Sequence, residues 1–460
     1  SIASRLHAIP FPSLTMWPLA FAILTVSPTL VHHGDHNKEQ LNHDVVHHNH
    51  AIAFEMYPAA HANLVTSDWN VVVIAKDGST RAGVGAVYQS TSSNREHENA
   101  PCTQAPYAQN RSSSWCGFAF AQPIVVSVTR TVGFGDGDVT LLPKSYGLTV
   151  SRVNKTTISF ELHPRALGYK ISIECNAQFT KQNVVKDSLL IFADPPESPS
   201  NVHIRNSSSV LYFGPGVHTL DGQLPIAAHI KTIYIAAGAW VDGGFITTVA
   251  DSSVNISGRG VISGRRFPFL HKASHCYYNG SFCWSLINLD KGVGHVVDGV
   301  TFVDPPQYYF RSYAENVVLR NVKMVAAWAC NTDGVVTGTN GIVDDCFIRS
   351  CDDSVKLYQP NMMVTNTIVW QMQNGAVFQL GWWTQHNQHN IHVENIDVIH
   401  FEPRLFEENN HGVISVVVNV PNSNSSISNV TWNNVRVHID DVFLRGSAPP
   451  PPQSQEIQHS

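Results

Sequence analysis

The feature that most constrains the fold is a short sequence unit that recurs along the second half of this 460-residue chain. Most copies have apolar residues at positions one, four and six and a turn-forming Asn, Asp or Gly at position three. The copies begin at Val297, Leu319, Val343, Val364, Val393 and Ile427. The first four begin 22, 24 and 21 residues apart. A single strand unit cannot bury its apolar face alone, so the copies must stack into a solenoid.

The residue types indicate which solenoid forms. The Leu-x-x-Leu-x-Leu signature of leucine-rich repeats is absent, and long segments with a period of 3.6 residues are nearly absent. Frequent β-branched residues also disfavour helical repeats. We therefore expect a parallel β-helix over residues 196–445, followed by a Pro-rich tail over residues 446–460.

A different pattern precedes the repeats. Short stretches that alternate apolar and polar residues, separated by turn residues, begin at Trp69, Ile124, Thr157 and Tyr169. Period-two alternation at this spacing predicts an antiparallel β-sandwich, which we place at residues 32–195. The prolines of segment 194–200 cannot donate hydrogen bonds to a sheet, so this segment is expected to link the two domains. The fold class is therefore all-β.

Composition and charge limit the partners of the chain. Only 14% of the residues are charged, 43% are hydrophobic and the formal net charge is −6, as in a folded chain without a clustered basic face. We therefore expect no nucleic-acid or membrane partner, and a monomer. After Asp353 the only Lys and Arg residues are Lys356, Arg404, Arg436 and Arg445.

Several features predict export from the cell. An apolar run from Met16 to Val26 has the length of a signal-peptide core, so residues 1–31 are expected to be a leader or an upstream extension of the reading frame, with a buried strand as the alternative. Cysteine spacing favours local pairs between Cys102 and Cys116 and between Cys276 and Cys283. Glycosylation sequons occur at Asn110, Asn154, Asn206, Asn255, Asn279, Asn424 and Asn429.

A His-rich segment between His32 and His50 has no spacing that defines a coordination geometry. We interpret these histidines as surface residues and expect neither a metal nor another cofactor.

Three aspartates fall at corresponding places in successive repeats. Asp333-Gly-Val and Asp353-Ser-Val align 20 residues apart, about one coil, and Asp352 precedes the second. Stacked strands lie about 4.8 Å apart, so Asp333 and Asp353 should occupy adjacent rungs. Asp352 would point to the opposite face unless the strand bends there. Close carboxylates raise at least one pKa, as glycoside hydrolysis requires of its acid and base. A calcium site or a solvated turn are the alternatives.

The motifs around these aspartates resemble those of glycoside hydrolase family 49, the dextranases and isopullulanases. The resemblance covers roughly residues 185–440. The family 28 polygalacturonases are related to family 49. The resemblance is carried by Asn331-Thr332-Asp333-Gly334, by residues 351–358, by the Gln-x-Gly-Trp-like segment 379–382 and by residues 235–243 and 393–400. This resemblance implies a β-sandwich followed by a right-handed parallel β-helix of the pectin-lyase-like type.

The same resemblance implies site residues and an activity. Asp352 would be the general acid, while Asp333 and Asp353 would hold and activate a water in an inverting mechanism, with carboxyl groups about 6.5–9.5 Å apart. Residues expected to bind substrate are Lys356, Tyr358, Gln379, Trp382, Asn374 and Tyr309. For Lys356 a salt bridge with Asp353 is an equal alternative to substrate binding. For the aromatic residues the alternative is packing in the core.

The resemblance also limits the substrate. Family 28 enzymes have Gly-His-Gly and Arg-x-Lys motifs that bind a substrate carboxylate, whereas this chain has Asn374-Gly-Ala-Val and no Arg-x-Lys. A secreted hydrolase acting on a neutral α-glucan is therefore expected. The alternatives are a hydrolase acting on an anionic polysaccharide, a non-catalytic carbohydrate-binding β-helix and, less favoured, a lyase.

Overall fold

The computed structural model describes a set of ranges that all belong to one compact unit, residues 50–460. These ranges are 53–91, 111–175, 178, 184–197, 207–267, 285–327, 332–382, 386–402, 412–418 and 424–438. The expected leader, the His-rich segment, the Pro-rich tail and the cysteine pair 276/283 lie outside them. Within these ranges no helix is both long and apolar enough to cross a membrane.

The first half of the described chain forms two facing sheets. One contains β1 (Phe54–Met56), β4 (Tyr88–Thr91), β5 (Ser112–Phe120), β7 (Val139–Leu142), β10 (Tyr169–Cys175) and β11 (Asp187–Asp194). The other contains β2 (Trp69–Ala75), β3 (Arg81–Gly83), β6 (Ile124–Arg130), β8 (Val150–Arg152) and β9 (Thr157–Leu162). Short 3₁₀ turns lie at Ala62–Leu64 and Lys144–Tyr146.

The alternation in these strands produces the core between the sheets. On β6, for example, Ile124, Val126 and Val128 are fully buried, while the residues between them are partly exposed. The predicted sandwich is thus confirmed, with one correction. Strand β5 runs parallel to β11, although every other strand pair of the sandwich is antiparallel. Alternation defines which face of a strand is buried, but it carries no information on strand direction.

Cysteine chemistry in this half differs from the expectation. Cys116 is a free thiol buried completely within β5, and burial raises its pKa to about 12. The pairing with Cys102 that the spacing predicted is therefore wrong.

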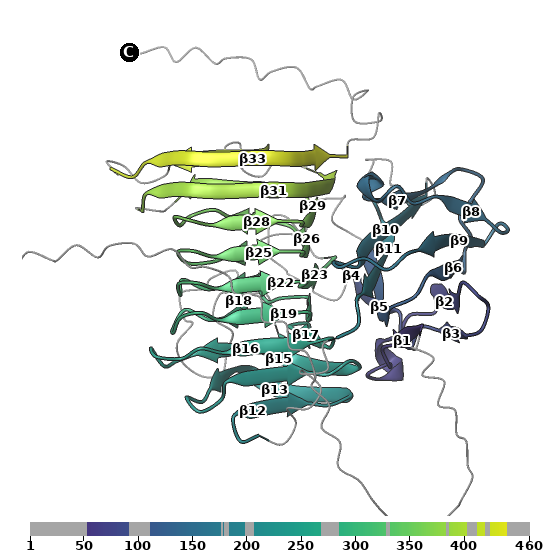
Figure 1. Cartoon of the computed structure of the whole chain (residues 1–460), viewed down its shortest axis with the longest axis horizontal. Helices are drawn as coiled ribbons and strands as arrows, with labels where there is room; N and C mark the ends of the chain where they lie inside the picture. Colours follow the sequence, from purple (N-terminus) through teal and green to yellow (C-terminus); the bar gives the residue numbers. More distant parts are fainter. Residues whose placement is uncertain are drawn as a thin grey trace, which may run out of the picture. The chain divides into compact units, whose positions relative to one another are not determined.

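The second half is a solenoid of parallel strands, β12 to β33, stacked coil upon coil (Figure 1). Its first strands are β12 (Val210–Phe213), β13 (Gly216–Ile226), β14 (Thr232–Ile235), β15 (Ala239–Thr247), β16 (Asn255–Gly258), β17 (Val261–Ser263), β18 (Ser285–Asn288), β19 (Val296–Asp298), β20 (Thr301–Val303), β21 (Tyr308–Arg311) and β22 (Val318–Arg320). It continues with β23 (Lys323–Val325), β24 (Val335–Val336), β25 (Ile342–Asp344), β26 (Phe347–Ser350), β27 (Val355–Lys356), β28 (Met363–Thr365), β29 (Ile368–Gln371), β30 (Ala376–Trp382), β31 (Gln388–Phe401), β32 (Gly412–Val418) and β33 (Ile427–Val437).

The register of the coils matches the repeat except in the last copy. Val297 pairs with Leu319, and the series continues through Val343 and Val364 to Val393. In the last coil, however, Val393 pairs with Trp432, so the copy that begins at Ile427 is five residues out of register. The pattern misleads here because each coil has two turn positions five residues apart, both of which favour Asn.

Those two turn positions form ladders of side-chain amides. At the first, Asn316, Asn340, Asn361, Asn390 and Asn429 all have positive φ angles, and from Asn340 onward each Nδ2 donates to the Oδ1 of the preceding rung at 2.7–3.1 Å. At the second, Asn395 donates to Asn366, and Asn434 donates to Asn395. Asparagine tolerates this left-handed backbone because its side chain can hydrogen-bond locally. The ladders therefore fix the turns of the coil.

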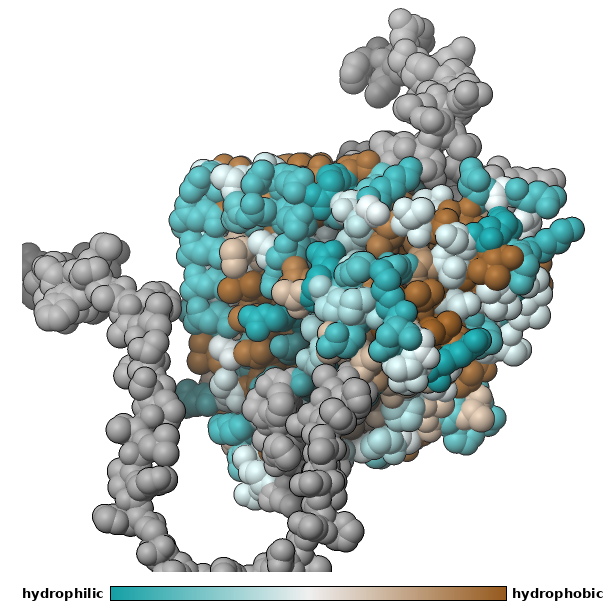
Figure 2. Space-filling model, turned by 45° about the vertical axis from the view of Figure 1, so that its right-hand side comes forward, coloured by the Kyte–Doolittle hydropathy of each residue, from teal (hydrophilic) through white to brown (hydrophobic). Residues whose placement is uncertain are grey.

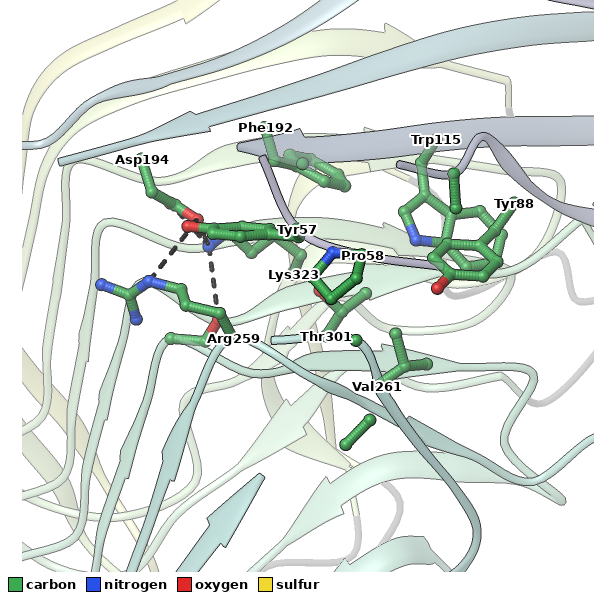
Figure 3. A pocket seen from close by; sticks show the side chains of 15 residues that line it. Tyr57, Pro58, Tyr88, Trp115, Phe192, Asp194, Arg259, Val261, Thr301 and Lys323 are labelled. Carbon is green, nitrogen blue, oxygen red and sulfur yellow. Dashed lines mark hydrogen bonds and ion pairs between the residues drawn. The ribbon is translucent and has the colours of Figure 1, made fainter. Parts of the chain in front are cut away.

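Buried ion pairs join the sandwich to the coil. Lys323 of β23 donates to both carboxylate oxygens of Asp194 on β11, at 2.7 and 2.9 Å, and Asn321 donates to Asp194 at 3.0 Å. The hydroxyl of Tyr57 donates to the same carboxylate at 3.3 Å, and Figure 3 shows Tyr57, Asp194 and Lys323 with Arg259 at one end of a small pocket. Arg111 and Glu402 form a second, bidentate pair at 2.9 Å.

The last coils carry exposed apolar side chains, and brown atoms lie along the top of the coloured part of the molecule in Figure 2. In this part of the coil Ile414, Val416, Ile427 and Val437 are exposed.

Candidate active site

The two repeated aspartates lie at the N-terminal ends of neighbouring strands. Asp333 precedes β24 and Asp353 precedes β27, and these strands pair in parallel with Val335 opposite Val355. The aspartates therefore occupy adjacent rungs, as their spacing predicted. The side chains of Asp333 and Asp353 lie on the same side as Lys356, because the chain is irregular just before each short strand.

Asp352 reaches the same place because the backbone bends. Strand β26 ends at Ser350, and a bend at Asp352 separates it from β27. One oxygen of Asp352 accepts a hydrogen bond from the Asp353 N–H at 2.8 Å, and the other accepts from Asn374 Nδ2 at 2.7 Å. Each of the three aspartates offers an oxygen within 4.8 Å of the others. The sequence required such a bend, and it is present.

A glycine makes the close approach at this bend possible. Gly375 has φ +76°, and a Cβ atom there would lie 2.4 Å from the Asp353 nitrogen and 2.8 Å from Asp352 Oδ1. Any other residue at this position would displace the two aspartates.

A single lysine neutralises part of the cluster. Lys356 Nζ lies 2.7 Å from Asp333 Oδ2 and also binds Asp353 Oδ2, and the residue is only 5% exposed. The rings of Tyr308 and Tyr358 have their centroids 5.3 and 5.6 Å from the same ammonium. The salt-bridge interpretation of Lys356 is therefore confirmed.

Burial and mutual repulsion alter the acidity of the carboxyl groups. Burial raises the pKa of Asp352 well above its usual range, and the charges of Asp333 and Asp353 add to this effect. Burial also raises the pKa of Asp333, to about 6, although Lys356 and a hydrogen bond from Tyr308 oppose the change. Burial alone would lower the pKa of Lys356, but the two carboxylates outweigh it and hold that pKa well above normal. A protonated Asp352 beside ionised partners is the arrangement that acid–base catalysis needs.

A buried amide that the sequence did not reveal supports the bend. Gln371 Nε2 donates to the backbone carbonyls of Asp352, at 3.0 Å, and of Asn374. Its Oε1 accepts from Ser354 Oγ at 2.6 Å. The residue is completely buried. The signal that could have found it is its place on the rung next to the two aspartates.

The other predicted site residues fall into three groups. Asn374, Tyr358 and Lys356 lie at the carboxylates. Gln379 pairs in register with Lys356 on the next rung, and its Oε1 is buried without a hydrogen-bond partner within the described ranges. Trp382 ends β30 half-buried, with no contact described between it and the carboxylates.

Tyr309 requires a correction. It is completely buried in the interior of the coil, and its hydroxyl donates to the Arg349 carbonyl at 2.9 Å. Its neighbour Tyr308 faces Lys356 and Asp333 instead. The two tyrosines are adjacent on a strand, so they point to opposite faces, and the sequence did not show which one faces the aspartates.

The three carboxylates approach one another closely. One oxygen of each aspartate lies within 4.8 Å of one oxygen of each of the others, whereas the expected distance of about 6.5–9.5 Å is the separation of whole carboxyl groups in an inverting pair and stays a prediction.

Known proteins with similar sequences include a dextranase and an isopullulanase. No protein-family model matches the chain. It is 25% identical to a dextranase of Arthrobacter sp. (strain CB-8), over 70% of this chain and 62% of the dextranase. It is 26% identical to an isopullulanase of Aspergillus niger, over 74% of this chain and 69% of the isopullulanase. The chain thus spans less than two thirds of the length of the bacterial dextranase it matches.

A solved structure shows the same fold. Dex49A from Penicillium minioluteum superposes with a TM-score of 0.70 at 20% identity, covering 83% of this chain and 80% of that one. The resemblance to family 49 and the expected order of β-sandwich and parallel β-helix are confirmed.

Proposed function

We propose that this protein is a glycoside hydrolase that cleaves a neutral α-glucan of the dextran or pullulan type. The observation that carries this proposal is the convergence of Asp333, Asp352 and Asp353 on one buried spot, where burial raises the pKa values of Asp333 and Asp352. The relatives named dextranase and isopullulanase support the substrate class. Secretion and a monomeric state stay predictions from the sequence.

Charge at the site favours a neutral substrate. The ammonium of Lys356 is already shared by two carboxylates, so it is not available to bind a uronic acid. Arg311 is a second cation in this stack of paired residues, three rungs from Gln379. It forms an ion pair with Asp290 at 3.2 Å. A site with more carboxylates than cations repels an anionic polysaccharide.

A substrate panel tests this proposal. The purified protein should release reducing sugar from dextran or pullulan and none from polygalacturonate. Release from polygalacturonate alone would contradict the neutral substrate.

In the mechanism that we propose, Asp352 donates a proton to the leaving oxygen. Asp333 then serves as the base, since its Oδ1 is buried and accepts no hydrogen bond from the described residues, which leaves it to accept one from the attacking water. Lys356 and Asp353 hold Asp333 in place. Gln379 Oε1, which is buried without a hydrogen-bond partner among the described residues, accepts a hydrogen bond from a sugar hydroxyl in this proposal.

The stereochemical outcome follows from these roles. Two carboxylates held about one ammonium favour a shared water and inversion. We expect inversion, so the first product seen by NMR during hydrolysis should be the β-anomer. A first-formed α-anomer would identify one of the aspartates as a nucleophile instead.

The pH dependence of activity should be bell-shaped. Asp333 must be ionised to accept a proton, and its pKa is about 6, so kcat/KM should fall as the pH drops through 6. Asp352 must be protonated, and its pKa is raised, so activity should fall again once the pH exceeds that raised pKa. Measuring kcat/KM between roughly pH 4 and pH 9 checks both limbs. A constant value between roughly pH 4 and pH 7 would show that Asp333 is not the base.

A non-catalytic carbohydrate-binding coil is the second candidate. The neutralisation of Asp333 and Asp353 by Lys356 and the low exposure of all three aspartates favour it. This candidate predicts binding to a glucan without any release of reducing sugar, and the substrate panel distinguishes the two.

A further inference from the structure

The carboxylate cluster has the composition of a site for a hard divalent cation. Asp333, Asp352 and Asp353 each offer an oxygen within 4.8 Å of the others. One oxygen of the cluster, Asp333 Oδ1, is buried and makes no hydrogen bond in the part of the chain that the structure describes. Calcium takes six to eight such oxygen ligands. The ammonium of Lys356, however, already lies between two of these carboxylates.

We propose that Lys356 is a positioning residue whose ammonium occupies the cation site of this cluster. The site accordingly takes no divalent cation while Lys356 is present, and it takes calcium when Lys356 is removed. The consequence for catalysis, an activity independent of divalent cations, rests on the proposed function. The consequence for binding does not.

The geometry of Lys356 supports this role. Its Nζ lies 2.7 Å from Asp333 Oδ2, only slightly more than the 2.3–2.6 Å of a calcium–oxygen bond. The rings of Tyr308 and Tyr358 flank the ammonium, so it cannot swing away without losing both ring contacts. With its side chain 6% exposed, Lys356 excludes a competing ion from the space that it fills.

Charge explains why removal should recruit a cation. Without Lys356, the carboxylates of Asp333 and Asp353 are buried with no ammonium between them, and each is only 3% exposed in its side chain. Uncompensated buried charge is strongly unfavourable, so the cluster must take up protons or another cation. Alanine at position 356 leaves space for an ion, whereas arginine retains the charge.

Calcium binding measured by calorimetry and thermal unfolding tests the proposal without any need for activity. We expect Lys356→Ala to bind about one calcium ion per chain and to gain thermal stability as calcium is added. The wild-type protein and Lys356→Arg should show neither effect, and chelation should leave both unchanged. Calcium binding by the wild type that Asp353→Asn abolishes would overturn the proposal, and so would a folded Lys356→Ala that binds none.

Two further variants make the test decisive. Adding Asp352→Asn to Lys356→Ala should weaken calcium binding at least tenfold, and unchanged binding would place the ion elsewhere and overturn the proposal. If Lys356→Ala folds only with calcium present, the proposal is supported. If it fails to fold in either condition, Lys356→Ala combined with Asp353→Asn decides, because folding of that pair supports a charge role and its failure to fold overturns it.

Discussion

Replacing Asp352 by Asn should lower kcat on the cleaved glucan by about 10²–10⁴-fold, the usual contribution of a general acid. Asparagine keeps the shape of Asp352 and its hydrogen bond from the Asp353 N–H, but it has no proton to give to the leaving oxygen. The loss should therefore appear in kcat measured by reducing-sugar release, with little change in KM. The same substitution at Asp298, a partly exposed residue of β19 outside the site, should leave activity unchanged.

The leaving group separates the acid from the bases. A glycosyl fluoride needs no proton to depart, so Asp352→Asn should retain most of its activity on the fluoride of the cleaved sugar. Asp333→Asn should lose activity on both substrates, because the attacking water still needs a base. Equal losses by Asp352→Asn on glucan and fluoride would show that Asp352 is not the acid.

The same variant should also be more stable than the wild type at neutral pH. A carboxyl whose pKa is raised on folding contributes stability that is present at low pH and lost as the pH rises through the raised value. Asparagine has no carboxyl group to titrate, so it does not lose this stability as the pH rises. Thermal unfolding at pH 7 should show a higher Tm for Asp352→Asn, and the difference should vanish at low pH. A lower Tm at pH 7 would contradict a raised pKa of Asp352 in the folded protein.

Replacing Lys323 by Met should destabilise the protein by about 3–5 kcal/mol, the cost of leaving a buried charge without its partner. Lys323 donates twice to Asp194, and their side chains are only 2% and 3% exposed. Arg259 lies 3.7 Å from the same carboxylate and Asn321 donates to it, so the loss should fall toward the lower end of that range. Urea unfolding followed by circular dichroism measures the change.

A paired variant identifies the cause of this loss. Lys323→Met combined with Asp194→Asn removes both charges and should recover most of the lost stability. If the double variant is as unstable as Lys323→Met alone, packing rather than charge holds this junction together.

The coil could be predicted from the sequence because each rung repeats the same burial problem. A period of 21–24 residues with turn-forming third positions leaves few alternatives to stacked strands. The register of the last coil could not be predicted, since Asn429 and Asn434 both fit the turn position. The parallel pair β5–β11 was equally inaccessible, because strand direction depends on the connections and not on the pattern of either strand.

The candidate site was also only partly predictable from the sequence. Asp333 and Asp353 follow from the rung spacing, and Asp352 follows once the chain bends. The choice between Tyr308 and Tyr309 depends on which face of β21 lies toward the bend at Asp352, and the sequence does not show this. Gln371 acts through backbone carbonyls, and such contacts leave no mark in a sequence.

The asparagine ladders give the coil an electrical direction. From Asn340 onward each amide of the first ladder donates toward the preceding rung, so the dipoles of Asn340, Asn361, Asn390 and Asn429 add instead of cancelling. Hydrogen bonds aligned in this way polarise one another. An aspartate in the middle of the ladder would accept from one neighbour but donate to none. Deamidation of a single asparagine would therefore introduce a charge and break the hydrogen-bonded row at the same position. Chemical ageing of one turn would thus also affect the hydrogen bonds of the neighbouring turns.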